Sequence, residues 1–172
     1  MSEPGELIND EAFISSINMK ELGKIDPKVA MAVRKSVAAT MDAMQFKGKA
    51  PNIVIAEGAI HDEHTGEDCP AVYDFSSQTV CIGQGLLQDT LREDYRGKIA
   101  NPAVASLLAA EETAHYIQDV RGRLPHQFDE SGEGDFEHYQ KPWELEAASV
   151  SVAVANKLFP KVNFSRKHQG VK

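Results

Sequence analysis

A helix of about twenty residues near the middle of the chain carries polar side chains on the face that should be buried. Pro102 suits its first position after Asn101 as a cap, and Gly122 supplies a stop signal. The apolar positions of its inner stripe are Val104, Leu107 and Leu108. The next positions at the same period are Glu111, His115 and Gln118, so polar residues continue the inward face.

Glu111 and His115 are four residues apart, so their side chains should point at one site, with Glu112 beside them. Burying an unpaired carboxylate costs several kcal/mol or forces the group to stay protonated. A divalent metal ion or another specific partner would remove that cost. The alternative is a solvated acidic patch beside a histidine of the core.

A second helix, expected from Pro142 to about Phe159, can complete such a site. Glu144 and Glu146 lie in its first turn, where acids are also favoured by the helix dipole alone. Glu144 heads a row of small residues, which are Ala148, Ser151 and Ala155. Such a row allows close approach of another helix, so Glu144 is predicted to meet the polar positions of the first helix.

The remaining pattern predicts an α+β fold with a small, mostly antiparallel sheet. An amphipathic helix should begin at Pro27, capped by Asp26, and run up to Gly48. The run 52–56 is typical of a strand, and the segments 71–75 and 79–83 indicate a hairpin. A short helix is expected at 86–91. With 172 residues, 42% of them hydrophobic, we expect one domain over 1–172 with loose ends at 1–10 and 165–172.

Charge and composition exclude several classes of partner. The net charge of −8, without a Lys/Arg cluster, argues against a nucleic-acid-binding surface. No run approaches the roughly 20 apolar residues that a membrane span needs. The segment 1–10 lacks the features of a secretory signal, so we expect a cytoplasmic location. Cys69 and Cys81 lack metal-type spacing, and a reduced pair is expected.

A loop after the first strand contains His61 and His64 among acidic residues. The two histidines are three residues apart, which would suit a metal on a helical turn. Gly58, Gly66 and Pro70 mark the segment as a loop, however. We interpret it as an acidic, solvated loop that could border a cleft.

Two short motifs and the order of the elements resemble the zincin metallopeptidases of the gluzincin type. In that family an active-site helix bears HExxH and a later helix bears ExxAD. The corresponding segments here are 111–115, EETAH, and 144–148, ELEAA. The resemblance spans about 53–158 and implies a zincin-like domain. It places the Tyr73-to-Ile82 hairpin where the family has the edge strand of its substrate cleft, so that a peptide would pair with this edge.

The resemblance assigns a role to each residue of the two motifs. It implies that His115 is the second histidine ligand, Glu144 the third ligand and Glu112 the general base. Two positions depart from the family. Glu111 stands at the position of the first histidine, and Ala148 replaces the aspartate. The implied metal ligands are therefore Glu111, His115 and Glu144, one imidazole and two carboxylates.

This EExxH ligand set changes the expected metal chemistry. Two carboxylates cancel the charge of a divalent ion, which weakens it as a Lewis acid. The affinity order favours zinc, while harder ligands move the preference toward manganese or iron. The implied reaction is hydrolysis of a peptide bond, with Glu112 taking a proton from the attacking water and giving it to the leaving amine. His126, His138 and Tyr139 are candidates for an oxyanion donor and equally for ordinary surface residues.

Two other functions remain open. A catalytically silent zincin-like domain would bind a protein or peptide, and the cations Arg121, Arg123 and Lys141 could then neutralise the acidic residues. A non-haem iron carboxylate protein is the third reading, because Glu112 and His115 form ExxH, although four-helix iron proteins use two copies. The sequence also leaves open which acid of each helix faces the site. Glu112 could replace Glu111 as ligand, and Glu146 could replace Glu144.

Overall fold

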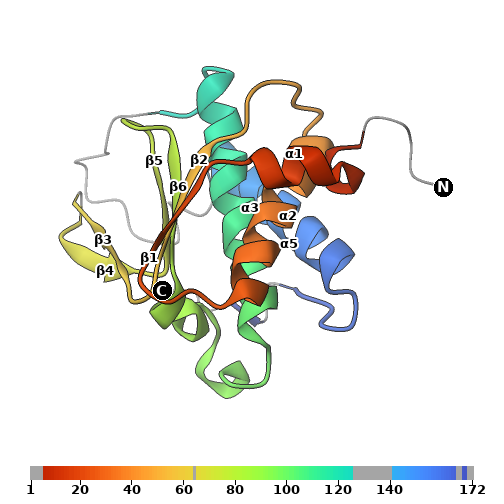
Figure 1. The fold of residues 1–172 in the computed structure, drawn as a ribbon. Helices are drawn as coiled ribbons and strands as arrows, with labels where there is room; N and C mark the ends of the chain where they lie inside the picture. The colour runs from red at the N-terminus through yellow and green to blue at the C-terminus, as the bar shows by residue number, and fades with distance from the viewer. Residues whose placement is uncertain (1–5, 64, 126–140, 166–167, 170–172) are drawn as a thin grey trace.

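The computed structural model describes residues 6–63, 65–125, 141–165 and 168–169 (Figure 1). It shows an α+β fold with a small mixed sheet and three long helices. The helices are α1 (Glu11–Ser16), α2 (Pro27–Ala43), α3 (Asn101–Val120) and α5 (Pro142–Leu158). The strands are β1 (Met19–Leu22), β2 (Asn52–Ala56), β3 (Ile60–Asp62), β4 (Glu67–Cys69), β5 (Ala71–Asp74) and β6 (Thr79–Gly83). Three 3-10 helices, η1 (Leu7–Asn9), η2 (Gln84–Thr90) and η3 (Glu93–Tyr95), complete the described elements.

The main sheet has the strand order β1-β2-β6-β5. β1 and β2 are parallel, as are β2 and β6, whereas β5 and β6 form an antiparallel hairpin. The predicted hairpin is confirmed, with Tyr73 opposite Val80. The prediction of a mostly antiparallel sheet is wrong, because α2 carries the chain from β1 back to a parallel β2. β1 itself was not predicted.

The predicted helices are present, with shifted ends. α2 begins at Pro27 with Asp26 as its cap, and it ends at Ala43 rather than near Gly48. The N-cap of α3 is Ala100, not Asn101. The Asn101 side chain instead accepts a hydrogen bond from Gln88 Nε2 at 2.7 Å. The short helix expected at 86–91 is the 3-10 helix η2.

Parts of both predicted loose ends contact the rest of the fold. The backbone N–H groups of Leu7 and Ile8 donate to the Asp42 carboxylate at 2.9 and 3.0 Å. The segment 6–10 therefore docks on α2 and is not a loose arm. Near the other end the His168 side chain is buried, and its backbone carbonyl accepts from the N–H of Arg92 at 2.9 Å.

Two further sequence expectations concern the cysteines and the His61 loop. Cys69 and Cys81 are free thiols, each half-buried. The loop around His61 forms the β3–β4 hairpin. His61 pairs there with Asp68 at 3.2 Å, and both side chains are exposed. His64 lies outside the described residues.

Within the described chain, no helix combines the length and apolarity required to cross a membrane.

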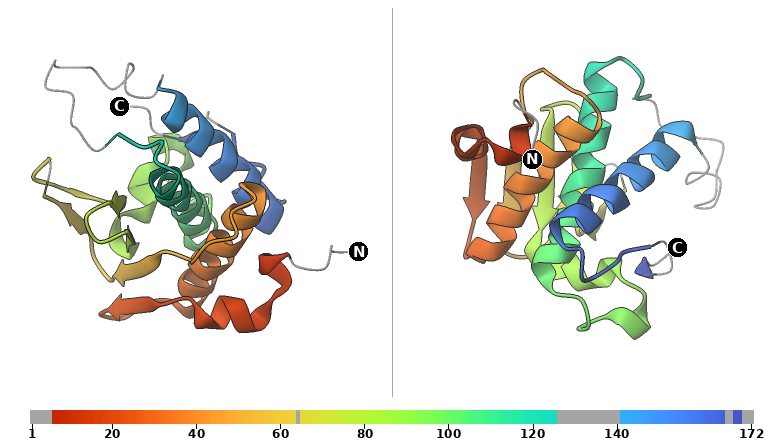
Figure 2. Two further views of the ribbon diagram at one scale, coloured as in Figure 1. Left: turned by 90° about the horizontal axis from the view of Figure 1, so that it is seen from above. Right: turned by 90° about the vertical axis from the view of Figure 1, so that its right-hand side faces the viewer.

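α3 lies at the centre of the molecule, between the sheet and α5 (Figure 2). It also packs along α2, where the hydroxyls of Ser36 and Ser106 are hydrogen-bonded at 2.6 Å. Small residues permit these close contacts, and the alanines of α3 that are 0% exposed are Ala105, Ala109, Ala110 and Ala114. Because α3 is covered on several sides, a polar side chain on it is buried wherever it points toward a neighbour.

Thr113 on α3 gives a prediction about stability. The residue is 0% exposed, and its hydroxyl has no hydrogen-bond partner in the described structure. A buried hydroxyl without a partner is destabilising, so Thr113→Val should raise the free energy of unfolding by about 1 kcal/mol. Chemical denaturation measures this change. The matched control is Thr40→Val, because the buried Thr40 hydroxyl donates to the Ser36 carbonyl at 2.7 Å. Equal effects of the two substitutions would contradict the prediction.

Candidate metal centre

Three side chains from two helices meet beside the sheet. Glu111 and His115 lie one turn apart on α3, and Glu144 lies in the first turn of α5. Each offers one ligand atom, and these atoms all lie within 4.8 Å of one another. His115 and Glu144 are 8% and 9% exposed, and Glu111 is half-buried. A buried cluster of this composition could hold a metal ion, and its donor atoms do not determine which metal.

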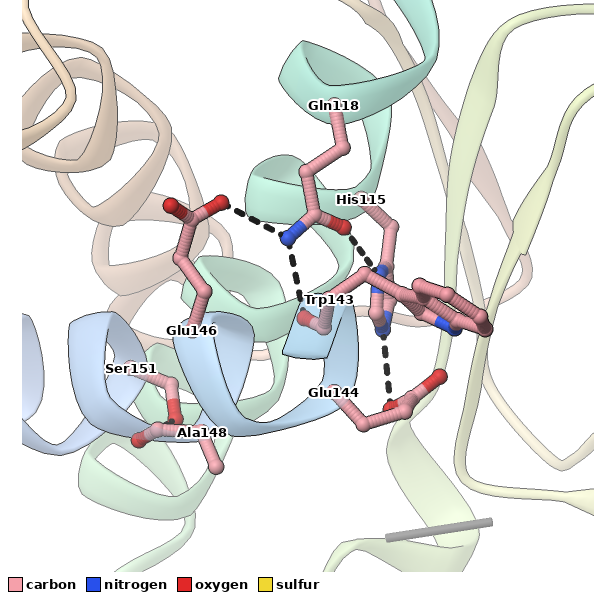
Figure 3. A network of polar contacts seen from close by, with 7 residues as sticks. All are labelled: His115, Gln118, Trp143, Glu144, Glu146, Ala148 and Ser151. Carbon is pink, nitrogen blue, oxygen red and sulfur yellow. Dashed lines mark hydrogen bonds and ion pairs between the residues drawn. The ribbon is translucent and has the colours of Figure 1, made fainter. Parts of the chain in front are cut away.

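The imidazole of His115 points its Nε2 atom at Glu144. The distance from Nε2 to the Oε2 atom of Glu144 is 3.4 Å (Figure 3). On the other side of the ring, Nδ1 lies 2.9 Å from Gln118 Oε1. His115 thus presents one nitrogen to the carboxylates and the other to an amide of its own helix.

Close packing of α5 on α3 brings Glu144 to this position. The α5 residues buried along the contact are Ala147, Ser151, Val154 and Ala155. Ala148, predicted to be in this row, is half-buried, and its carbonyl accepts from the Ser151 hydroxyl at 2.9 Å. The predicted close approach is therefore present, with Ala147 in the buried position.

The structure separates Glu144 from Glu146. Glu144 faces His115, whereas the Glu146 carboxylate accepts from Gln118 Nε2 at 2.9 Å and lies 3.8 Å from Arg123 Nη2. Glu146 therefore contacts Gln118 and Arg123 rather than the ligand cluster, and its side chain is partly exposed. The alternative in which Glu146 replaces Glu144 does not match this geometry.

Glu112 lies close to β5, because the backbone N–H of Tyr73 acts to lower the pKa of its carboxyl group. Burial raises the pKa of Glu112 to about 8. The positive charge of His115 opposes this rise, while the charges of Glu111 and Glu144 add to it. Glu112 is thus a carboxyl group that can hold a proton near neutral pH beside the cluster.

The pKa of His115 is also displaced. Burial, the largest single influence, lowers this pKa. The hydrogen bond to Glu144 and the negative charges of Glu112 and Glu144 together outweigh burial and raise the pKa to about 10. The surrounding carboxylates therefore make the position of His115 favourable for a cation, either a proton or a metal ion.

The β5 edge explains how a backbone group reaches Glu112. The Gly83 N–H donates to the Pro70 carbonyl at 2.7 Å, which fixes the alternation of the antiparallel ladder. Backbone groups of Val72 then face β6, and those of Ala71 and Tyr73 face away from it. In the described part of the chain, no strand pairs with β5 on that outer side.

The Tyr73 side chain makes a second connection between β5 and α3. Its hydroxyl donates to Asp119 Oδ2 at 2.5 Å, one turn beyond His115 on the same helix. Burial and this hydrogen bond raise the pKa of Tyr73. Tyr73 therefore joins the edge strand to α3 at two points. The sequence contained no signal for this role, because it depends on strand register.

Several other predicted site residues are not part of the cluster. Arg121 Nη2 donates to the Met44 carbonyl at 2.7 Å, and its guanidinium lies over the Phe46 ring. Arg123 pairs with Glu146. Neither arginine is therefore directed at Glu111. The proposed oxyanion donors His126, His138 and Tyr139 lie outside the described residues.

Comparison with known proteins gives no relative to guide the interpretation. No protein-family model, no curated protein and no solved structure matches this chain. The chemistry of the centre is therefore inferred from its own residues.

Proposed function

We propose that this protein is a metal-dependent hydrolase resembling the zincin peptidases, acting on a peptide bond. The observation that carries this proposal is the convergence of Glu111, His115 and Glu144 within 4.8 Å, with the Glu112 carboxyl beside them. The donor set fits a divalent cation, since one imidazole nitrogen and two carboxylates supply three ligand atoms. A fourth position would be left for water or substrate.

A divalent ion held by these residues would polarise the scissile carbonyl and make a water molecule more acidic. Glu112 would move the protons, a role supported by its position beside the cluster and by a raised pKa that suits exchange near neutral pH. It would take a proton from the attacking water and give it to the leaving amine. His115, Glu111 and Glu144 would hold their positions throughout.

An extended peptide is the substrate class that the β5 edge supports. The outward backbone carbonyls of Ala71 and Tyr73 could accept hydrogen bonds from such a segment, while the Tyr73 N–H faces Glu112. The carbonyl of a peptide paired there would lie near the ligand cluster. We keep a cytoplasmic location as a prediction.

Zinc is the metal we propose, with manganese and iron as alternatives. Three nearby carboxylates, Glu111, Glu112 and Glu144, make the centre richer in hard oxygen ligands than a site with two imidazoles. The general affinity order still places zinc above manganese and ferrous iron.

One observation favours a second function, a zincin-like domain that binds a peptide without cutting it. Glu111 occupies the position of the first histidine, and two carboxylate ligands would weaken a bound ion as a Lewis acid. A four-helix iron protein is supported less, since the sheet packs directly on α3 through β5 and β6.

Metal analysis tests the proposed function. Protein purified without a metal-affinity tag should contain about one equivalent of a transition metal by mass spectrometry, as expected for a single three-ligand site. His115→Ala should abolish this content because it removes the imidazole that the described cluster contains. His61→Ala is the matched control, because His61 is exposed and lies on the β3–β4 hairpin. Wild-type protein that stays empty after addition of zinc or manganese would contradict the proposal.

A further inference from the structure

Gln118 is a buried polar residue of α3 with three hydrogen bonds, one to His115 on the same helix and two to α5. It is 1% exposed and lies one turn after His115 on α3. Its Oε1 atom lies 2.9 Å from His115 Nδ1. Its Nε2 atom donates to the Trp143 carbonyl and to Glu146 Oε1, both at 2.9 Å (Figure 3).

The orientation of the Gln118 amide follows from its partners on α5. A backbone carbonyl and a carboxylate can only accept, so the side of the amide that faces Trp143 and Glu146 must be the NH₂ group. The carbonyl oxygen of Gln118 therefore faces His115. This assignment needs no assumption about the protonation of the imidazole.

The amide in turn fixes the imidazole. Because Gln118 Oε1 is an acceptor, His115 Nδ1 must carry the hydrogen in this contact. When the ring is neutral, its lone pair is then on Nε2, the atom that faces Glu144 at 3.4 Å. A ring of the opposite tautomer would present its lone pair to Gln118 and an N–H group to a metal ion.

We propose that Gln118 is a positioning residue that holds His115 in the Nδ1–H tautomer and so directs Nε2 into the metal centre. This inference rests on the proposed metal site and adds the residue that orients one of its ligands. The same amide ties α3 to the first turn of α5, the turn that carries Glu144. One side chain thus sets both the ring orientation of one ligand and the place of another.

Glu146 and Arg123 extend the arrangement to the surface. Glu146 accepts from the Gln118 amide and lies 3.8 Å from Arg123, and both charged side chains are partly exposed. Glu146, the second acid of the 144–148 motif, therefore accepts a hydrogen bond from the Gln118 amide, whereas Glu144 faces His115. Partners in this outer layer typically change metal affinity by about 10-fold to 100-fold when removed.

The test uses zinc as the probe and Gln118→Leu as the variant, which keeps a side chain that extends to Cδ and removes the amide oxygen and nitrogen. Zinc affinity is measured by competition with a chelator, and imidazole nitrogen shifts of the zinc-loaded protein are recorded by NMR. In wild type we expect a protonated Nδ1 and a zinc-bound Nε2 on His115. In Gln118→Leu we expect zinc binding roughly 10-fold to 100-fold weaker.

Thr113→Val is the matched control, a buried polar-to-apolar change on α3 that touches none of these contacts. It should bind zinc as wild type does. Folded Gln118→Leu with wild-type zinc affinity, or zinc on Nδ1 in wild type, would overturn the positioning role and leave the metal site intact. If Gln118→Leu does not fold, the wild-type nitrogen shifts decide alone. Wild type that binds no zinc would overturn the role together with the proposed function.

Discussion

Glu111→Gln and Glu111→His should separate the two proposed functions, and the change to histidine should raise peptide hydrolysis by roughly 10² to 10³-fold. It replaces one carboxylate of the cluster by an imidazole and leaves His115 and Glu144 in place. Removing one negative charge at about 4 Å from a cation is worth about 4 kcal/mol at an effective dielectric constant near 20. A bound ion would then be a stronger Lewis acid. The measurement is the rate of cleavage of a fluorogenic protein substrate with zinc present.

Glu111→Gln is the control for this gain, because it removes the same charge without supplying an imidazole. It should bind zinc more weakly than Glu111→His and hydrolyse less. The double variant Glu111→His/Glu112→Gln should keep its zinc and lose about 10² to 10⁴-fold of the activity, the usual contribution of a general base. Glu111→His that binds zinc and cleaves nothing would favour the silent peptide-binding domain.

Helix α3 shows what the sequence could predict. The position of this helix follows from its apolar period, from Pro102 at its start and from Gly122 after its end. Gly122 takes a φ of 71°, a conformation that favours glycine. The Glu111–His115 pair followed from spacing alone. The cap was misassigned because the Asn101 side chain bonds Gln88, a partner thirteen residues away in sequence.

The sheet shows what local patterns could not predict. β1 has the sequence MKEL, without β-branched residues, and its burial pattern is mostly exposed. It is a strand because its backbone pairs with β2, with Met19 opposite Ile53. Parallel pairing depends on a crossover and carries no short-range signal. The sheet was therefore predicted with the wrong proportion of antiparallel pairs.

The candidate site was also predictable only in part, because some of its contacts follow from local spacing and others depend on strand register. The helix spacing brought Glu111 and His115 together, and the small residues of α5 indicated the approach of Glu144. The contact between the Tyr73 N–H and Glu112 depends on which β5 residues face outward, which the ladder with β6 decides. The inward position of Gln118 was visible in the period, but its hydrogen bonds to α5 were not.

The metal-free protein should lose stability as the pH rises, and the loss should be on the order of several kcal/mol. The folded-state pKa of Glu112 is raised from 4.5 to about 8, so its favourable contribution is present below pH 4.5 and is lost up to pH 8. The pKa of His115 is raised from 6.5 to about 10, so its contribution is present below pH 6.5 and is lost up to pH 10. Thermal or urea unfolding of chelator-treated protein across this range measures the effect.

Zinc should reverse this dependence, because a divalent ion among Glu111, His115 and Glu144 takes the place of the proton on His115. Binding then releases protons, so zinc affinity and the stabilisation by zinc should both increase with pH. Glu112→Gln should flatten the metal-free curve between pH 4.5 and 6.5, where only Glu112 contributes. It should also lower the upper end of the His115 window, because the charge of Glu112 helps to raise the pKa of His115. A metal-free protein that becomes more stable as the pH rises would show that the cluster is neutralised in another way. In that case the carboxylates would no longer argue for a bound cation.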